Sequence, residues 1–216
     1  MKKSSLPDFD LIETLLWENG KYFLLDLHLK RLEKSAQYFS FSYTQDSVAS
    51  ALEDLTVSFD PTRKYRVRLL LEKSGKLNLT SGVLPPPDGS PASITISEER
   101  TDKNDIFLLH KTTNRTLYNR ELTKWRAKGF FDVIFLNQET EVTEGALTNI
   151  IMQKGTAWWT PPLSSGLLGG VYREHLLKTE ALPLKEQILH LEDLLHADRI
   201  FIINSVRKMV PAVLAK

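Results

Sequence analysis

Cysteine is absent from the sequence, which excludes disulfide bonds, thiolate metal sites and cysteine nucleophiles. The five histidines lack HxxxH or HExxH spacing, so we expect no bound metal. With 28 basic and 27 acidic residues the net charge is +1, which argues against nucleic-acid binding. No run approaches the roughly 18 apolar residues of a membrane span, and MKKSSLPDFDLIETLL lacks the apolar centre of a signal peptide. We therefore expect a cytoplasmic protein without membrane association.

What is present is ordinary for a globular enzyme or binding protein. The chain has 216 residues, of which 42% are hydrophobic and 25% charged, enough to bury the core of one large or two small domains. The strongest break is PPPDGSPA, residues 85–92. It predicts an N-terminal α+β domain over 1–88 and a C-terminal domain over 89–216.

Turn dipeptides and hydrophobic periodicity organise the N-terminal part. Asn19-Gly20 joins two apolar runs and predicts a β-hairpin, and Ser74-Gly75 predicts a second one within KYRVRLLLEKSGKLNLTSG. Apolar residues at 29, 32, 36 and 39 predict a helix behind Asp26 as its N-cap. Val48 to Val57 predicts a second helix.

Strands dominate the C-terminal part. The expected strands are SITISEE, FFDVIFLNQETEV, TNIIMQKGTAWWT and DRIFIINSV. Helices are expected over about 114–128, in GGVYREHLLKTEAL and in LEDLLHA. Hairpin-joined strands mixed with helices favour an α+β fold over a doubly wound parallel sheet.

Three features are candidates for chemistry. In VTEGALTNII, Glu144 is either a turn carboxylate or is held toward a positively charged group. Lys111 ends the apolar run IFLLH, where partial desolvation would lower the pKa of its amine as a nucleophile requires, although most lysines are solvated. The stretch TPPLSSGLLGGVYR is either a tight loop or a helix start that binds an anion, with Arg31 and Ser205 completing a phosphate site if the fold brings them near.

Six segments together resemble a known family. They are HLKRLEKSA, YRVRLLL, HKTTNR, FDVIFLNQETEVTEGALTNII, TPPLSSGLLGGVYRE and INSVRKMVP. Their order and spacing are similar to those of the class IV aminotransferases, the fold-type IV pyridoxal 5′-phosphate (PLP) enzymes. These include branched-chain aminotransferases, D-amino acid aminotransferases and 4-amino-4-deoxychorismate lyases. The resemblance implies a two-lobed, D-amino acid aminotransferase-like α+β fold with a smaller N-terminal lobe and a larger, β-rich C-terminal lobe.

The resemblance also implies roles for individual residues. Lys111 would bind PLP covalently and then act as the base, and Glu144 would pair with the protonated pyridine nitrogen. Arg31 would bind the phosphate, helped by the backbone of Val171 and Tyr172 and by the Ser205 hydroxyl. Thr148 and Asn149 would shape the wall beside the ring.

Within the family, the details resemble the lyase branch. KTTNR has Asn114-Arg115 where the aminotransferases usually have Asn-Tyr, and whether Tyr118 replaces that tyrosine is left open. The implied reaction releases pyruvate and 4-aminobenzoate for folate biosynthesis. The alternatives are a class IV aminotransferase acting on D- or branched-chain amino acids, and a non-catalytic binding module.

The substrate of such a lyase is a small-molecule amine with two carboxylates, which arginines would bind. The candidates are Arg66 and Arg68, which face the same side of a strand, together with Arg115 and Arg207. Arg66 and Arg68 could equally lie on a solvated strand face. The resemblance further implies a homodimer and a functional link to aminodeoxychorismate synthase.

Overall fold

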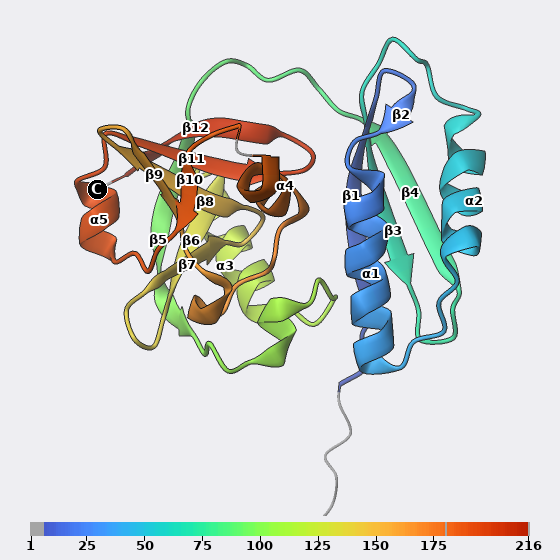
Figure 1. Cartoon of the computed structure of the whole chain (residues 1–216), viewed down its shortest axis with the longest axis horizontal. Helices are drawn as coiled ribbons and strands as arrows, with labels where there is room; N and C mark the ends of the chain where they lie inside the picture. Colours follow the sequence, from blue (N-terminus) through green and yellow to red (C-terminus); the bar gives the residue numbers. More distant parts are fainter. Residues whose placement is uncertain (1–6, 180, 216) are drawn as a thin grey trace, which may run out of the picture. The chain divides into compact units, whose positions relative to one another are not determined.

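The computed structural model describes residues 7–179 and 181–215, which form two compact units (Figure 1). One unit runs up to Pro85 and also contains His110–Arg115, and the other contains Pro86–Leu109 and the chain from Thr116 onward. The division into domains at residue 88 stays a prediction; it did not anticipate that 110–115 belong with the N-terminal part. The start of the chain, MKKSSL, on which the expectation about a signal peptide depends, lies outside the described residues.

The first unit is built on a four-stranded antiparallel sheet of order β2-β1-β3-β4. Its strands are β1 (Leu11–Glu18), β2 (Lys21–Tyr22), β3 (Tyr65–Leu71) and β4 (Leu77–Val83). Asn19 and Gly20 have φ of 53° and 77°, which confirms the predicted hairpin turn. The second strand is shorter than predicted: after the hydrogen bond from Phe23 N–H to the Leu16 carbonyl, Leu24 adopts a φ of 55° and helix α1 begins at Leu25.

Two helices accompany this sheet. Helix α1 (Leu25–Phe39) packs on β1, along which it runs in Figure 1, and α2 (Gln45–Thr56) lies beside β4. The predicted helical period is confirmed, since residues 29, 32, 36 and 39 are all buried. The prediction of Asp26 as N-cap is wrong. The cap is Leu24, with φ of 55°, and Asp26 lies in the first turn, where its carboxylate still interacts favourably with the helix dipole.

The second unit contains an eight-stranded mixed sheet of order β10-β9-β8-β11-β12-β5-β6-β7. The strands are β5 (Ala92–Thr101), β6 (Asp132–Asn137), β7 (Val142–Gly145), β8 (Asn149–Lys154), β9 (Ala157–Thr160), β10 (Leu184–Glu186), β11 (Arg199–Asn204) and β12 (Lys208–Leu214). The pairs β5–β6, β5–β12 and β9–β10 are parallel and the rest antiparallel. This arrangement confirms the α+β class.

The sequence did not predict β10 or β12. Strand β12 contains Pro211, and proline usually argues against a strand inside a sheet because it cannot donate a backbone hydrogen bond. Here β12 pairs with β5 only at residues 212–214, so Pro211 precedes the stretch that is paired on both sides.

The helices of the second unit are α3 (Thr116–Arg126), α4 (Val171–Thr179) and α5 (Leu191–Leu195), with short 3₁₀ turns η1 (Ile106–Leu109) and η2 (Leu163–Ser165). Strand β6 is buried along its whole length, and one side of it packs against α3. Within residues 7–179 and 181–215, no helix has both the length and the apolar character needed to cross a membrane.

Candidate active site

Lys111 is fixed in the first unit by backbone hydrogen bonds to β1. Its carbonyl accepts a hydrogen bond from Ile12 N–H at 2.8 Å, and Thr113 N–H donates to the Asp10 carbonyl at 2.9 Å. Asp10 N–H in turn donates to the Thr113 hydroxyl at 2.9 Å. Lys111 itself is half-buried. A loop lysine is therefore held with the rigidity of a strand.

Arg31, in the same unit, is held by a buried carboxylate. Glu13 on β1 accepts hydrogen bonds from Arg31 Nε at 2.8 Å and from one terminal nitrogen at 2.7 Å. The Arg31 side chain is 15% exposed and that of Glu13 3%. Such a two-bond contact fixes both the position and the plane of the guanidinium.

His28 completes this cluster. Its Nδ1 lies 2.7 Å from Glu13 Oε2. Burial alone would raise the pKa of Glu13, but the charges and hydrogen bonds of Arg31 and His28 bring it down to about 2. Burial, together with the charges of Arg31 and Lys111, lowers the pKa of His28 although Glu13 raises it. Among the groups that lower the pKa of Glu13, the charge of Arg31 has the largest effect.

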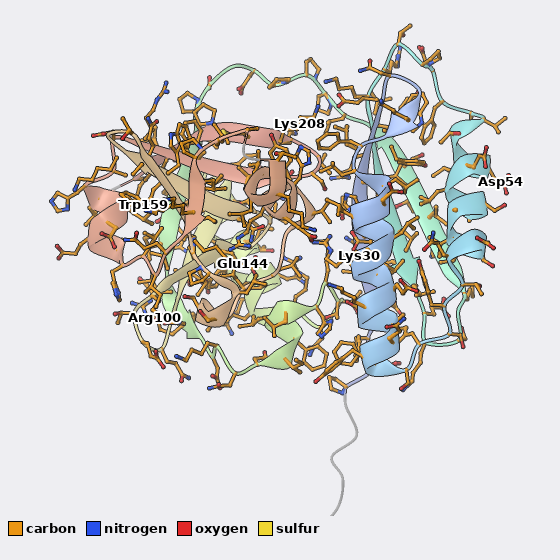
Figure 2. The ribbon with its side chains drawn as sticks, viewed as in Figure 1. Lys30, Asp54, Arg100, Glu144, Trp159 and Lys208 are labelled. Atoms are coloured by element: carbon orange, nitrogen blue, oxygen red, sulfur yellow. The ribbon has the colours of Figure 1, made fainter. Side chains whose placement is uncertain are left out.

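Glu144 lies in the second unit, near the end of β7. It is 5% exposed, and Figure 2 places it inside that unit. Two neutral donors hold its carboxylate: the Tyr118 hydroxyl donates to Oε1 at 3.1 Å, and Asn149 Nδ2 donates to Oε2 at 3.2 Å. Glu144 is thus a buried, oriented acceptor rather than an exposed turn residue.

The turn after Glu144 is organised by Asp132. Its carboxylate accepts hydrogen bonds from Leu147 N–H at 3.1 Å and from the Thr148 hydroxyl at 2.7 Å. A side chain on Gly145 would lie 2.5 Å from Asp132 Oδ2, so this close approach requires glycine. Burial raises the pKa of Asp132 to about 6 despite these hydrogen bonds. The Thr148 hydroxyl therefore supports the turn through Asp132.

Asn149 connects Glu144 to the start of α4. Besides Glu144, its Nδ2 binds the Leu168 carbonyl at 3.0 Å, and any Cβ on Gly170 would overlap its side-chain oxygen. The first hydrogen bond of α4 runs from Glu174 N–H to the Gly170 carbonyl at 2.9 Å. The N–H groups of Val171 and Tyr172 therefore lie in the helix's first turn, where backbone geometry and the helix dipole suit an anion.

Ser205 lies close in the fold to the turn after Glu144. It is 7% exposed and follows β11, whose Ile203 pairs in register with Asn149. Asn204 accepts from the N–H groups of Val206 and Arg207 and donates to the Leu147 carbonyl at 3.4 Å. The second unit thus brings together the predicted residues Glu144, Thr148, Asn149 and Ser205 and, through Asn149, the start of α4.

The four arginines predicted to bind substrate lie in separate places. Arg66 and Arg68 are exposed on one side of β3, opposite the buried side chains of that strand. Arg115 is half-buried in the segment that carries Lys111. Arg207, in the second unit, has its guanidinium 5.9 Å from the centre of the Phe131 ring. Their role toward a substrate stays a prediction.

Three further residues, which sequence reasoning did not assign, form hydrogen bonds to predicted site residues or to the turn that follows one of them. Glu13 holds Arg31, Asp132 holds the turn after Glu144, and Tyr118 binds Glu144. Glu13 and Asp132 occur in strand-like runs where nothing distinguishes them from surface carboxylates. For Tyr118 the only signal was its place seven residues beyond Lys111.

The family model described as amino-transferase class IV matches residues 10–214, and the chain belongs to this family. Enzymes of this family depend on pyridoxal phosphate. The family, the fold and the enzymatic nature expected from the sequence are thereby confirmed.

Individual relatives agree with this assignment. A crystal structure from Mesorhizobium loti, provisionally described as an amino-acid aminotransferase, is similar with a TM-score of 0.90 and 31% identity, covering 96% of this chain and 100% of that one. The aminodeoxychorismate lyase of Bacillus subtilis is 28% identical over 93% of this chain and 75% of its own length. A Thermotoga maritima protein, provisionally assigned as a branched-chain-amino-acid aminotransferase, is 28% identical over 92% of this chain and 74% of its own length.

Proposed function

We propose that the chain is a PLP-dependent 4-amino-4-deoxychorismate lyase that supplies 4-aminobenzoate to folate biosynthesis. The observation that carries this proposal is the segment Lys111–Arg115, in which an arginine follows the asparagine and the backbone is fixed to β1. The Bacillus subtilis lyase among the relatives supports the same branch.

We assign to residues of each unit a part of the donor set that PLP needs. Lys111 supplies an amine for the aldehyde carbon, and Glu144 supplies a buried carboxylate for the ring nitrogen. The phosphate would be bound by Arg31, by the N–H groups of Val171 and Tyr172, and by the Ser205 hydroxyl. The Asn149–Gly170 contact, which excludes any larger side chain at 170, keeps the start of α4 in place for this task. When bound, the cofactor supplies a ring that accepts the electron pair left on the substrate carbon after proton loss.

The chain's own residues account for the remaining chemistry. Lys111 Nζ would take the proton from the amine-bearing carbon of the substrate, and Glu144 would keep a proton on the ring nitrogen. The carbon–oxygen bond to the enolpyruvyl group then breaks with its electron pair on oxygen, the released enolate takes up on its methylene carbon the proton held by Lys111 to give pyruvate, and the substrate ring becomes aromatic. No water or oxidant is consumed. Because aromatisation drives the reaction, the enzyme mainly supplies position and a base.

We further propose that Arg66, Arg68, Arg115 and Arg207 recognise the two substrate carboxylates, that Thr148 and Asn149 support the ring wall, and that the enzyme is a cytoplasmic homodimer linked functionally to aminodeoxychorismate synthase. The alternative function is a class IV aminotransferase acting on D- or branched-chain amino acids. The Thermotoga maritima relative favours that alternative. It would use the same cofactor residues and differ in its second half-reaction.

The decisive experiment supplies purified protein with PLP and 4-amino-4-deoxychorismate and measures 4-aminobenzoate and pyruvate. D-Alanine or a branched-chain amino acid with 2-oxoglutarate serves as the parallel aminotransferase assay. We expect equal amounts of the two lyase products and a yellow protein that Lys111→Ala decolourises. Lys30→Ala, the same change at an exposed residue of α1 (Figure 2), should leave both unchanged. Transamination without lyase products would refute the lyase proposal, and a colourless wild type would refute PLP binding.

A further inference from the structure

Glu144 has a hydrogen-bond donor on each carboxylate oxygen, and the two donors are held differently. Asn149 Nδ2 is shared between Glu144 and the Leu168 carbonyl, at 3.2 and 3.0 Å. Tyr118 comes from α3 and donates its hydroxyl at 3.1 Å. The tyrosine therefore belongs to an element other than the strands that carry Glu144 and Asn149.

Packing fixes the direction of the Tyr118 hydroxyl. Tyr118 lies in the first turns of α3, and its half-buried ring packs on Phe135 with centroids 4.6 Å apart at 59°. It also packs against the cluster of Val133, Phe135 and Ala146. Ala146 follows Glu144 by two residues, so ring and carboxylate share one rigid neighbourhood. A ring held in this way needs little ordering to form the bond, unlike a flexible surface side chain.

We propose that Tyr118 is a positioning residue for Glu144, which its hydroxyl orients and keeps in the ionised form toward the cofactor's ring nitrogen. This inference rests on the proposed binding of PLP. Tyr118 acts through Glu144 and exchanges no proton with the substrate.

The effect follows from where a shared proton resides. A proton between a carboxylate and a pyridine nitrogen stays on the nitrogen when the carboxylate is well stabilised as an anion, and a donor to the carboxylate provides that stabilisation. A hydrogen bond to a charged group in a buried site changes such an equilibrium by about tenfold or somewhat more. Without Tyr118 the carboxylate becomes more basic and the ring a weaker electron acceptor.

The test compares Tyr118→Phe with wild type in the PLP-loaded full chain. PLP labelled with ¹⁵N in the ring reports the protonation of that nitrogen by its chemical shift, without substrate or turnover. The series runs upward from pH 7, where Asp132, with a pKa of about 6, is ionised throughout. Tyr22→Phe is the matched control, because it removes a tyrosine hydroxyl that donates to the Leu52 carbonyl at 2.9 Å in the first unit.

We expect Tyr118→Phe to lower the ratio of protonated to neutral ring nitrogen by about tenfold at pH 7, because the shared proton moves toward the more basic carboxylate. Substitution of Tyr118 by 3-fluorotyrosine, a stronger donor of similar size, should raise this ratio. In the lyase assay kcat should fall about tenfold while KM changes by less than about twofold, because Tyr118 acts on the electron-accepting ring through Glu144 and does not contact the substrate.

The outcomes separate this inference from the proposed function. If Tyr118→Phe folds, binds PLP and keeps the wild-type ratio of protonated to neutral ring nitrogen while Glu144→Gln changes it, the role of Tyr118 is refuted and PLP binding stands. If Tyr118→Phe fails to fold, the fluorotyrosine protein decides, and an unchanged ratio there refutes the inference. If the wild type takes up no PLP, the proposed function falls and this inference with it.

Discussion

Replacing Glu13 with glutamine removes the negative charge that holds Arg31. The substitution keeps the size of the side chain, so packing around β1 changes little. It loses the ion pair with Arg31, whose Nε and one terminal nitrogen lie at 2.8 and 2.7 Å, and it places an amide where His28 and Arg31 require an acceptor. The first unit should therefore be destabilised, and Arg31 should no longer be fixed for its proposed role in phosphate binding.

The magnitude follows from the pKa of Glu13. It falls from 4.5 to about 2, and at about 1.4 kcal/mol per unit the ionised form contributes about 3 kcal/mol to folding. Because the folded-state pKa is depressed, this stabilisation is fully present above pH 4.5 and is lost as the pH falls toward 2. Glu13→Gln should be about 3 kcal/mol less stable than wild type at pH 7, and the difference should disappear near pH 2.

Amide hydrogen exchange in β1 and α1 is the suitable assay, because it reports on the first unit separately from the second. Protection should fall by about two orders of magnitude at neutral pH. Glu53→Gln, the same change at an exposed residue of α2, is the control and should leave protection unchanged. A loss of protection that is equally large at acid and neutral pH would show that the charge of Glu13 is not what stabilises the unit.

Three further predictions concern other parts of the chain. The pKa of Asp132 is raised from 3.8 to about 6, so the turn after Glu144 should lose up to about 3 kcal/mol of stability as the pH rises from 4 to 6. Faster hydrogen exchange of Leu147 N–H would report this loss. Asp132→Ala should abolish the pH dependence, and a pH dependence that is unchanged in this variant would assign it to another group. Gly170→Ala must displace the Asn149 side chain and should weaken PLP binding about tenfold or more, measured by spectral titration. A variant with wild-type affinity would show that the close contact between Gly170 and Asn149 is not needed for PLP binding. Gly20→Ala places a side chain on a residue with a φ of 77° and should lower the free energy of unfolding, measured with denaturant, by about 1 kcal/mol. Gly82→Ala, where the added Cβ meets open space and φ is not positive, should be better tolerated. Equal effects of the two substitutions would show that the positive φ at Gly20 is not what requires glycine there.

Local patterns in the sequence were reliable where a single interaction decides the structure. Asn19-Gly20 tolerates positive φ, so it marked the hairpin, and the apolar period of α1 marked the face that is buried. The N-cap of α1 was mispredicted because Asp26 is a good capping residue by type. In the structure the hairpin's last hydrogen bond, from Phe23 to Leu16, directly precedes the cap Leu24, and the helix begins at Leu25. A propensity is a weak preference, and a neighbouring element can override it.

The residues of the candidate site likewise fall into those that the sequence indicated and those that it did not. The residue types and order of Lys111, Glu144 and the glycine-opened helix were readable, because the chemistry of a lysine, a carboxylate and a helix start depends little on context. The supports of these groups were not. Glu13, Asp132 and Tyr118 reach their partners across 18, 15 and 26 residues of chain.

The sequence by itself determined the family, the α+β class and most helices and strands, since these follow from periodicity, turn residues and motif order, and it predicted the groups that would hold PLP. Only the tertiary structure decided which side chains hold those groups in place. Strand pairing and helix packing bring distant residues into hydrogen-bonding range, and burial there shifts the pKa of Glu13 down and that of Asp132 up. Neither shift can be deduced from neighbours along the chain, because both depend on which groups surround each carboxylate in space.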